Sequence, residues 1–208
     1  AELDDLVFGG WDPISPNVLE AARTAGVLEG DDLSEISSDL ESIIPMEAVF
    51  DKKWVSRLDG VRVKDIESKW DQAEALIQDI ANFKEENDCD RLVMVWCGST
   101  EAFQEPSEVH ASVAAFEEGL RNNDPNISPS QIYAYAALQS DVPFANGAPN
   151  LSCDLDCIVE LSKSRGVPIA GKDFKTGQTL MKTLLAPGFK ARMLGLEGWY
   201  STNILGNR

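Results

Sequence analysis

The stretch Val167-Pro-Ile-Ala-Gly-Lys-Asp-Phe-Lys-Thr-Gly-Gln-Thr-Leu-Met-Lys182 combines the signals of a strand, a polar turn and a helix. Residues 167–170 are short and apolar, as in a buried strand, and residues 179–185 have the pattern of a helix start. The first N–H groups of a helix lack internal partners and carry a partial positive charge, so such a turn predicts an anion site. The residues expected to hold a phosphorylated ligand are Thr176, Gly177, Gln178 and Thr179.

The same stretch contains the spacing of a P-loop, GxxxxGK, between Gly166 and Lys172. A P-loop continues with a Ser or Thr that binds magnesium, whereas this chain has Asp173. The residues between the two glycines resemble a strand and not a loop wrapped around phosphate. We therefore expect no P-loop here.

Apolar segments alternate with helical patterns along the chain, which predicts an α/β fold with a parallel sheet. The clearest helical pattern is 65–87, where apolar residues recur at steps of three and four. Residues 92–96 are apolar throughout, so a fully buried strand is expected there. Other expected strands are 3–8 and 48–50, with an extended pair at 192–196 and 198–202. Other expected helices are 17–27, 29–41, 108–121 (capped by Ser107), 130–139 and 155–164.

The chain of 208 residues is strongly acidic, with 18 basic and 35 acidic side chains and a formal charge of -17. This charge argues against nucleic acid or an anionic membrane as the main partner. An anionic substrate would need local cations, and basic residues do gather late in the chain. They are Lys172, Lys175, Lys182, Lys190 and Arg192.

Cysteine and histidine are too sparse to build a zinc site. The four cysteines form no CxxC pair, and the single histidine, His110, falls in an acidic helical segment that we expect to lie far from the motifs. Because the chain is not rich in cysteine, reduced thiols in a cytoplasmic protein are expected. No apolar run approaches the ~20 residues of a membrane span.

The strand–turn–helix stretch resembles the GDDFKSGQTxxK signature of the myo-inositol-1-phosphate synthase (inositol-3-phosphate synthase) family. Four further segments resemble family motifs, in the same order along the chain. They are Leu6-Val-Phe-Gly-Gly-Trp-Asp12 (GGWD), Val93-Met-Val-Trp-Cys-Gly-Ser-Thr-Glu101 (VxWTANTE), Pro143-Phe-Ala-Asn-Gly-Ala-Pro-Asn150 (PFINGSPQN) and Ser201-Thr-Asn-Ile-Leu-Gly-Asn-Arg208 (SYNHLGNND). Lys172 and Leu180 depart from many relatives and indicate a bacterial-type branch.

The resemblance implies a Rossmann-like parallel sheet with helices on both faces, followed by the start of an inserted α+β catalytic and tetramerisation domain. We expect a partial NAD-binding domain at 1–179 and the inserted domain from 180 to 208. Family members convert glucose 6-phosphate into myo-inositol phosphate, the first step of inositol and phosphatidylinositol biosynthesis. Bound NAD oxidises one sugar carbon, the ring closes by an internal aldol step, and the same NADH reduces the product. A homotetramer is also implied.

Site residues carry over from the matching positions of the motifs. Catalytic roles are implied for Asp173 and Asn207, and the phosphate cradle matches Thr176, Gly177, Gln178 and Thr179. Two substitutions put side-chain contacts in doubt: Cys97-Gly-Ser-Thr100 stands for Thr-Ala-Asn-Thr, and Ala148 stands for Ser. The residues implied to contact NAD are Asp12, Cys97, Gly98, Ser99, Thr100, Gly147, Ala148, Asp173, Phe174 and Thr176. From the residues alone, a turn cap before Pro13 is the favoured role of Asp12.

No GxGxxG motif for the pyrophosphate occurs in the sequence. The resemblance places that motif upstream of Ala1 and the principal catalytic lysines downstream of Arg208. We therefore expect an internal portion of a longer enzyme that is inactive by itself. Two alternatives stay open: an NAD-dependent dehydrogenase of a phosphorylated sugar, and an inactive pseudoenzyme or fragment. The dehydrogenase is disfavoured because no His or Tyr is placed as proton donor.

Overall fold

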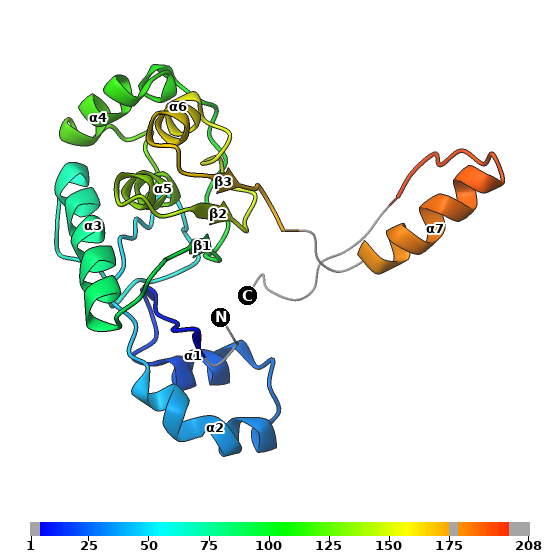
Figure 1. Ribbon diagram of the computed structural model, residues 1–208, viewed down its shortest axis with the longest axis horizontal. Coiled ribbons are helices and arrows are strands. Elements are labelled where there is room, and N and C mark those ends of the chain that lie inside the picture. The colour runs from blue at the N-terminus through cyan, green and yellow to red at the C-terminus, as the bar shows by residue number, and fades with distance from the viewer. Residues whose placement is uncertain (1–4, 175–178, 200–208) are drawn as a thin grey trace. The chain divides into compact units, whose positions relative to one another are not determined.

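The computed structural model describes residues 5–174 and 179–199, and it divides the chain into two compact units (Figure 1). The first unit spans Ala1–Lys172 and the second Asp173–Arg208. Each unit is described by itself below.

Three parallel strands form the sheet of the first unit, in the order β1-β2-β3. They are β1 (Met94–Trp96), β2 (Phe144–Asn146) and β3 (Ile169–Ala170). Phe144 pairs with Met94 on one side and with Ile169 on the other. Helices connect each strand to the next, as parallel pairing requires. The predicted α/β class with a parallel sheet is confirmed.

The two faces of β1 differ in burial. Met94 is 9% exposed, whereas Val93 and Val95 are 67% and 47% exposed. Successive side chains of a strand point to opposite faces, so only one face of β1 is covered by the described residues. Helices α3 (Lys69–Glu86) and α5 (Pro129–Gln139) supply that cover (Figure 1). The expectation that 92–96 is buried throughout was therefore wrong.

Helix α5 is the centre of the core, because every residue from Pro129 to Leu138 is buried. Its start follows a capping box, in which Ser128 and Gln131 satisfy each other's backbone N–H groups. Helix α3 begins after the N-cap Ser68, later than the predicted residue 65, and it buries one apolar stripe, as its sequence pattern predicted. The stripe consists of Ala73, Leu76 and Ile80.

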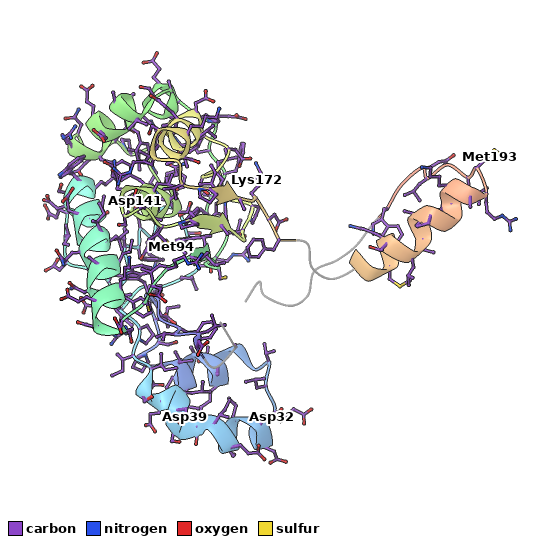
Figure 2. All side chains as sticks on the ribbon, in the orientation of Figure 1. Asp32, Asp39, Met94, Asp141, Lys172 and Met193 are labelled. Atoms are coloured by element: carbon purple, nitrogen blue, oxygen red, sulfur yellow. The ribbon has the colours of Figure 1, made fainter. Side chains whose placement is uncertain are left out.

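The other helices of this unit lie close to their predicted positions. They are α1 (Val18–Ala25), α2 (Gly30–Ser42), α4 (Val113–Arg121) and α6 (Asp156–Arg165). Helix α2 buries none of its residues, and the acidic side chains of Asp32 and Asp39 project from it (Figure 2). The predicted helix 108–121 is interrupted, because Ser112 caps α4 and leaves a short 3-10 helix, η2 (Glu108–His110), before it.

Two strand predictions were wrong in this unit. Residues 5–8 form no strand, and Phe8 is 75% exposed. Residues 48–50 contribute one isolated parallel bridge, from Ala48 to Val63, and Trp11 makes another with Met46. A strand needs a neighbour for its backbone groups, and an apolar run does not reveal whether one exists. Strand β2 was not predicted.

The second unit contains α7 (Thr179–Ala191), which begins at the predicted residue. Residues 192–199 form no strand, so the predicted strand 192–196 was wrong. The predicted strand 198–202 lies partly outside the described residues.

In the first unit, Gly166 ends α6 with φ of 67° and residues 169–170 are strand, which confirms that no P-loop is present. In the described part of the chain, no helix is long and apolar enough to cross a membrane.

Candidate dinucleotide site

A cavity of about 470 Å³ lies in the first unit, next to the carboxyl end of β1. Its walls are mostly apolar and come from β1, α3 and the segments around the two isolated bridges. Four of the residues predicted to contact NAD line it: Asp12, Cys97, Gly98 and Ser99. Residues from two distant motifs thus share one hollow at the edge of the sheet where ligands of such folds bind.

Asp12 performs the turn-capping role and keeps a second oxygen available. Its Oδ1 accepts the N–H groups of Ile14 at 2.7 Å and Ser15 at 3.0 Å. Its Oδ2 has no hydrogen-bond partner among the described residues. A carboxylate held in this way can accept the hydroxyl groups of a ribose with its open oxygen.

Trp11 fixes the backbone next to Asp12. Its Nε1 donates to Asp79 Oδ2 at 2.7 Å, and the same carboxylate pairs with Lys64 at 2.9 Å. The Trp11 ring also packs edge-on against Tyr133, with ring centroids 5.2 Å apart. Tyr133 accepts the N–H of Val49 at 2.9 Å, and burial raises the pKa of its hydroxyl above the usual range. The sequence did not single out these anchors of the cavity wall.

The loop after β1 presents an exposed tip made of residues 97–100. A Cβ atom on Gly98 would lie 2.8 Å from the ring of Trp96, so the loop backbone approaches that ring more closely than a side chain would permit. The Trp96 Nε1 is buried without a partner in the part of the chain that the structure describes. Thr100 lines a second, smaller cavity of about 150 Å³ instead of the first.

Gly147 and Ala148 follow β2 and do not line the larger cavity. The N–H of Gly147 donates to the carbonyl of Trp96 at 2.9 Å, and the N–H of Ala148 to Asn146 Oδ1 at 3.0 Å. Ala148 is 7% exposed. Both backbone donors are therefore used within the protein.

The remaining predicted residues lie in the second unit or outside the description. Asp173 and Phe174 are exposed, and Asp173 has a φ of 61°. Thr179 begins α7, as a phosphate cradle at a helix start requires. The other predicted cradle and catalytic residues, Thr176, Gly177, Gln178 and Asn207, lie outside the described residues.

His110 is not far from the motifs, contrary to expectation. It is 3% exposed and lines the smaller cavity together with Thr100 and Asn150. The short turn η2 folds it back, so that Nδ1 accepts the N–H of Ser107 at 3.0 Å and Nε2 lies 3.2 Å from Gln131 Oε1. Both ring nitrogens are thus engaged inside the protein, which still disfavours His110 as a proton donor to substrate.

Lys172 forms an ion pair with Asp154 at 3.2 Å, so its charge is partly balanced. Lys182 and Lys190 lie on α7, in the second unit. Within residues 5–174 and 179–199, no three His, Cys, Asp or Glu side chains gather as a metal site, and the four cysteines are free thiols.

The larger cavity fits a dinucleotide. Its volume lies within the range of ~300–1,000 Å³ found for small-molecule sites. It combines apolar walls for a flat ring, the Asp12 carboxylate for a ribose and the exposed loop after β1 for polar contacts, and the buried Glu101 also lines it. NAD supplies hydride acceptance and return when it is bound in such a site.

Known proteins resemble this chain over nearly its whole length. Residues 1–195 match the NAD-binding domain model described as myo-inositol-1-phosphate synthase. Inositol-3-phosphate synthase 1 of Bacteroides thetaiotaomicron is 52% identical over 100% of the chain, and the Citrus paradisi enzyme is 32% identical over 98% of it. The aligned region spans 48% and 41% of these two relatives, so the chain covers about half their length.

The fold agrees with a solved structure of the same kind. The crystal structure of inositol-3-phosphate synthase from Caenorhabditis elegans superposes with a TM-score of 0.83 at 26% identity. The match covers 90% of this chain and 38% of that one. With the family model matching residues 1–195, the chain belongs to the myo-inositol-1-phosphate synthase family.

Proposed function

We propose that the whole protein is an inositol-3-phosphate synthase that cyclises glucose 6-phosphate to myo-inositol phosphate with NAD as a recycled cofactor. One observation carries the proposal: Asp12 and the loop tip at 97–99, from two separate family motifs, line the same cavity. The family membership and the identity to named synthases support it.

Within this proposal, the first unit holds the cofactor. Asp12 accepts the hydroxyl groups of the adenosine ribose through Oδ2 while Oδ1 keeps the turn closed. Cys97, Gly98 and Ser99 contribute backbone groups, which explains why their side chains can differ from the common Thr-Ala-Asn. Thr100 ends the tip of this loop, and Gly147 and Ala148 support the loop from the end of β2, where the N–H of Gly147 donates to the Trp96 carbonyl.

The second part of the proposal concerns the substrate. Thr176, Gly177, Gln178 and Thr179 hold the phosphate at the start of α7, while Asp173, Phe174 and Thr176 contact NAD. Asp173 and Asn207 act at the reacting sugar. Residues 1–179 belong to the NAD-binding domain and 180–208 to the catalytic and tetramerisation domain. A homotetramer and a cytoplasmic location complete the proposal.

The reaction can be tested by its redox balance. The whole protein, supplied with glucose 6-phosphate and NAD, is expected to form myo-inositol phosphate without net NADH. Accumulation of NADH in proportion to product would identify the dehydrogenase alternative. Absence of any turnover, together with absence of NAD binding, would identify a pseudoenzyme.

A further inference from the structure

We propose that Glu101 is a positioning residue that, through Ser130 and Asn150, holds the loops after β1 and β2 in the conformation that binds the dinucleotide. The inference rests on the proposed function, because it names how the NAD site of that function is kept in shape. The sequence motifs implied no role for any of these three side chains.

Glu101 directly follows the exposed loop tip but is itself only 7% exposed. Its Oε1 accepts the N–H of Ser130 at 2.8 Å, and its Oε2 accepts the hydroxyl of the same residue at 2.6 Å. Ser130 lies in the first turn of α5, where unpaired N–H groups and the helix dipole favour a carboxylate. The end of the tip is thereby attached to the most buried helix of the unit.

Asn150 connects Glu101 to the loop after β2. Its Oδ1 accepts the N–H of Glu101 at 2.9 Å, a contact that spans 49 residues of sequence. Asn150 is 5% exposed, so this is a buried hydrogen bond between the two loops. The orientation of the amide follows from the contact, because only its oxygen can accept a backbone N–H.

Asn146 extends the connection to the ends of β2 and β3. It is fully buried, and its Nδ2 donates to the carbonyl of Asn150 at 2.7 Å and to Ser152 Oγ at 2.8 Å. At the end of β3, Gly171 has a φ of 124°, and a Cβ there would lie 2.6 Å from the Asn146 carbonyl oxygen. Buried polar contacts thus join the loops after β1 and β2, and the end of β3 lies close against them.

This arrangement gives the loop tip a fixed start and a fixed end. At the start, the carbonyl of Trp96 accepts the N–H of Gly147. At the end, Glu101 is held by Ser130 and Asn150. A ligand that binds through loop backbone gains affinity when the loop is ordered beforehand, because the loop then loses less conformational entropy on binding.

The test compares NAD affinity of the whole protein with Glu101→Ala, Glu101→Gln and the matched control Glu105→Ala. Glu105 is exposed in the same loop, so its removal makes the same change of charge without touching α5. Calorimetric titration of NAD, urea unfolding and the KM for glucose 6-phosphate at saturating NAD are measured for each variant.

We expect Glu101→Ala to weaken NAD binding about tenfold, since it leaves the Ser130 N–H unpaired and releases the tip. Glu101→Gln should stay within about twofold of wild type, because its carbonyl accepts the Ser130 N–H and its NH2 donates to the Ser130 hydroxyl. The control should also stay near wild type, and the KM for glucose 6-phosphate should not change.

Several outcomes would overturn the inference. If the wild type binds NAD and Glu101→Ala binds it equally well, Glu101 serves stability alone. Equal losses in Glu101→Ala and Glu101→Gln would show that charge matters and not the hydrogen bonds. If Glu101→Ala fails to fold, Asn150→Ala replaces it, and unchanged NAD affinity there overturns the inference. Failure of the wild type to bind NAD removes the proposed function, and the inference with it.

Discussion

The loop after β1 has an exposed tip, residues 97–100, and a buried root, Glu101, which differ in what their side chains do. The tip departs from the family signature at its first three positions, whereas the root keeps the signature's Glu. Cys97, Gly98 and Ser99 of the tip are exposed and line the cavity, whereas the root is buried and works through side-chain hydrogen bonds to Ser130. Substitutions should therefore be tolerated at the exposed positions Cys97 and Ser99, but not at Gly98, and they should be costly at the root and its partners.

The largest effect is expected at Asn146, which is fully buried and connects to the root through Asn150. Asn146→Ala leaves the N–H of Ala148, the carbonyl of Asn150 and the hydroxyl of Ser152 without their partner. We expect a loss of about 3 kcal/mol in the free energy of unfolding. Urea denaturation measures it, with Asn82→Ala on the exposed surface of α3 as control. A loss of unfolding free energy no larger than that of the control would contradict a stabilising role for the Asn146 hydrogen bonds.

A smaller effect is expected when one contact of the root is deleted. Ser130→Ala removes the hydroxyl that donates to Glu101 at 2.6 Å but keeps the backbone N–H that donates to the other carboxylate oxygen. The free energy of unfolding should fall by about 1.5 kcal/mol, as for a hydrogen bond to a charged group. In the background of Glu101→Ala the same substitution should cost less, because the two residues share the contact. Full additivity would contradict the contact.

The carboxyl group of Glu101 predicts a dependence of the free energy of unfolding on pH. Burial raises the pKa of Glu101 above its ordinary value of 4.5, the Asp51 carboxylate adds to the increase, and the bonds from Ser130 oppose it. The folded protein therefore retains this proton to higher pH than the unfolded chain. Its contribution to stability is complete below pH 4.5 and is lost as the pH rises through the folded-state value.

Glu101→Gln removes this titration and should be at least as stable as wild type at neutral pH. The difference in unfolding free energy between variant and wild type should shift toward the variant as the pH rises above 4.5. Urea unfolding at a series of pH values measures it. A constant difference would mean that Glu101 titrates alike in both states.

The smallest effect is expected at the tip. Ser99→Ala changes an exposed side chain and leaves the loop backbone in place. NAD affinity should stay within about twofold of wild type, the range typical of surface substitutions. A tenfold loss in calorimetry would show that the tip binds through its side chains, and the contrast between tip and root would disappear.

Most helices could be predicted because their signals are local. Ser68 before an apolar stripe and Ser128-Pro129 before α5 mark helix starts in the sequence itself. Strands were less predictable, since pairing depends on distant neighbours. Residues 5–8 look like a strand and find no partner, whereas β2 is only three residues long and follows a proline.

The candidate site was also only partly predictable, because its motifs are local in the sequence whereas the contacts behind them are not. Asp12 and the tip could be named from motif positions, and they line one cavity. The network behind them could not be named, because Glu101 meets Ser130 and Asn150 across 29 and 49 residues. Buried polar side chains have no periodic pattern, so only the fold reveals their partners. The same holds for His110, which the turn at η2 brings near Thr100.

A calorimetric titration of NAD into the whole protein, wild type and Asp12→Asn, shows whether Asp12 helps to bind the dinucleotide. The substitution keeps the Oδ1 that caps the turn and removes the charge of the open oxygen. We predict saturable binding to the wild type and an affinity about tenfold lower for the variant. Absence of binding to the wild type, or equal affinity of the two proteins, would contradict a dinucleotide site at Asp12 and the β1 loop.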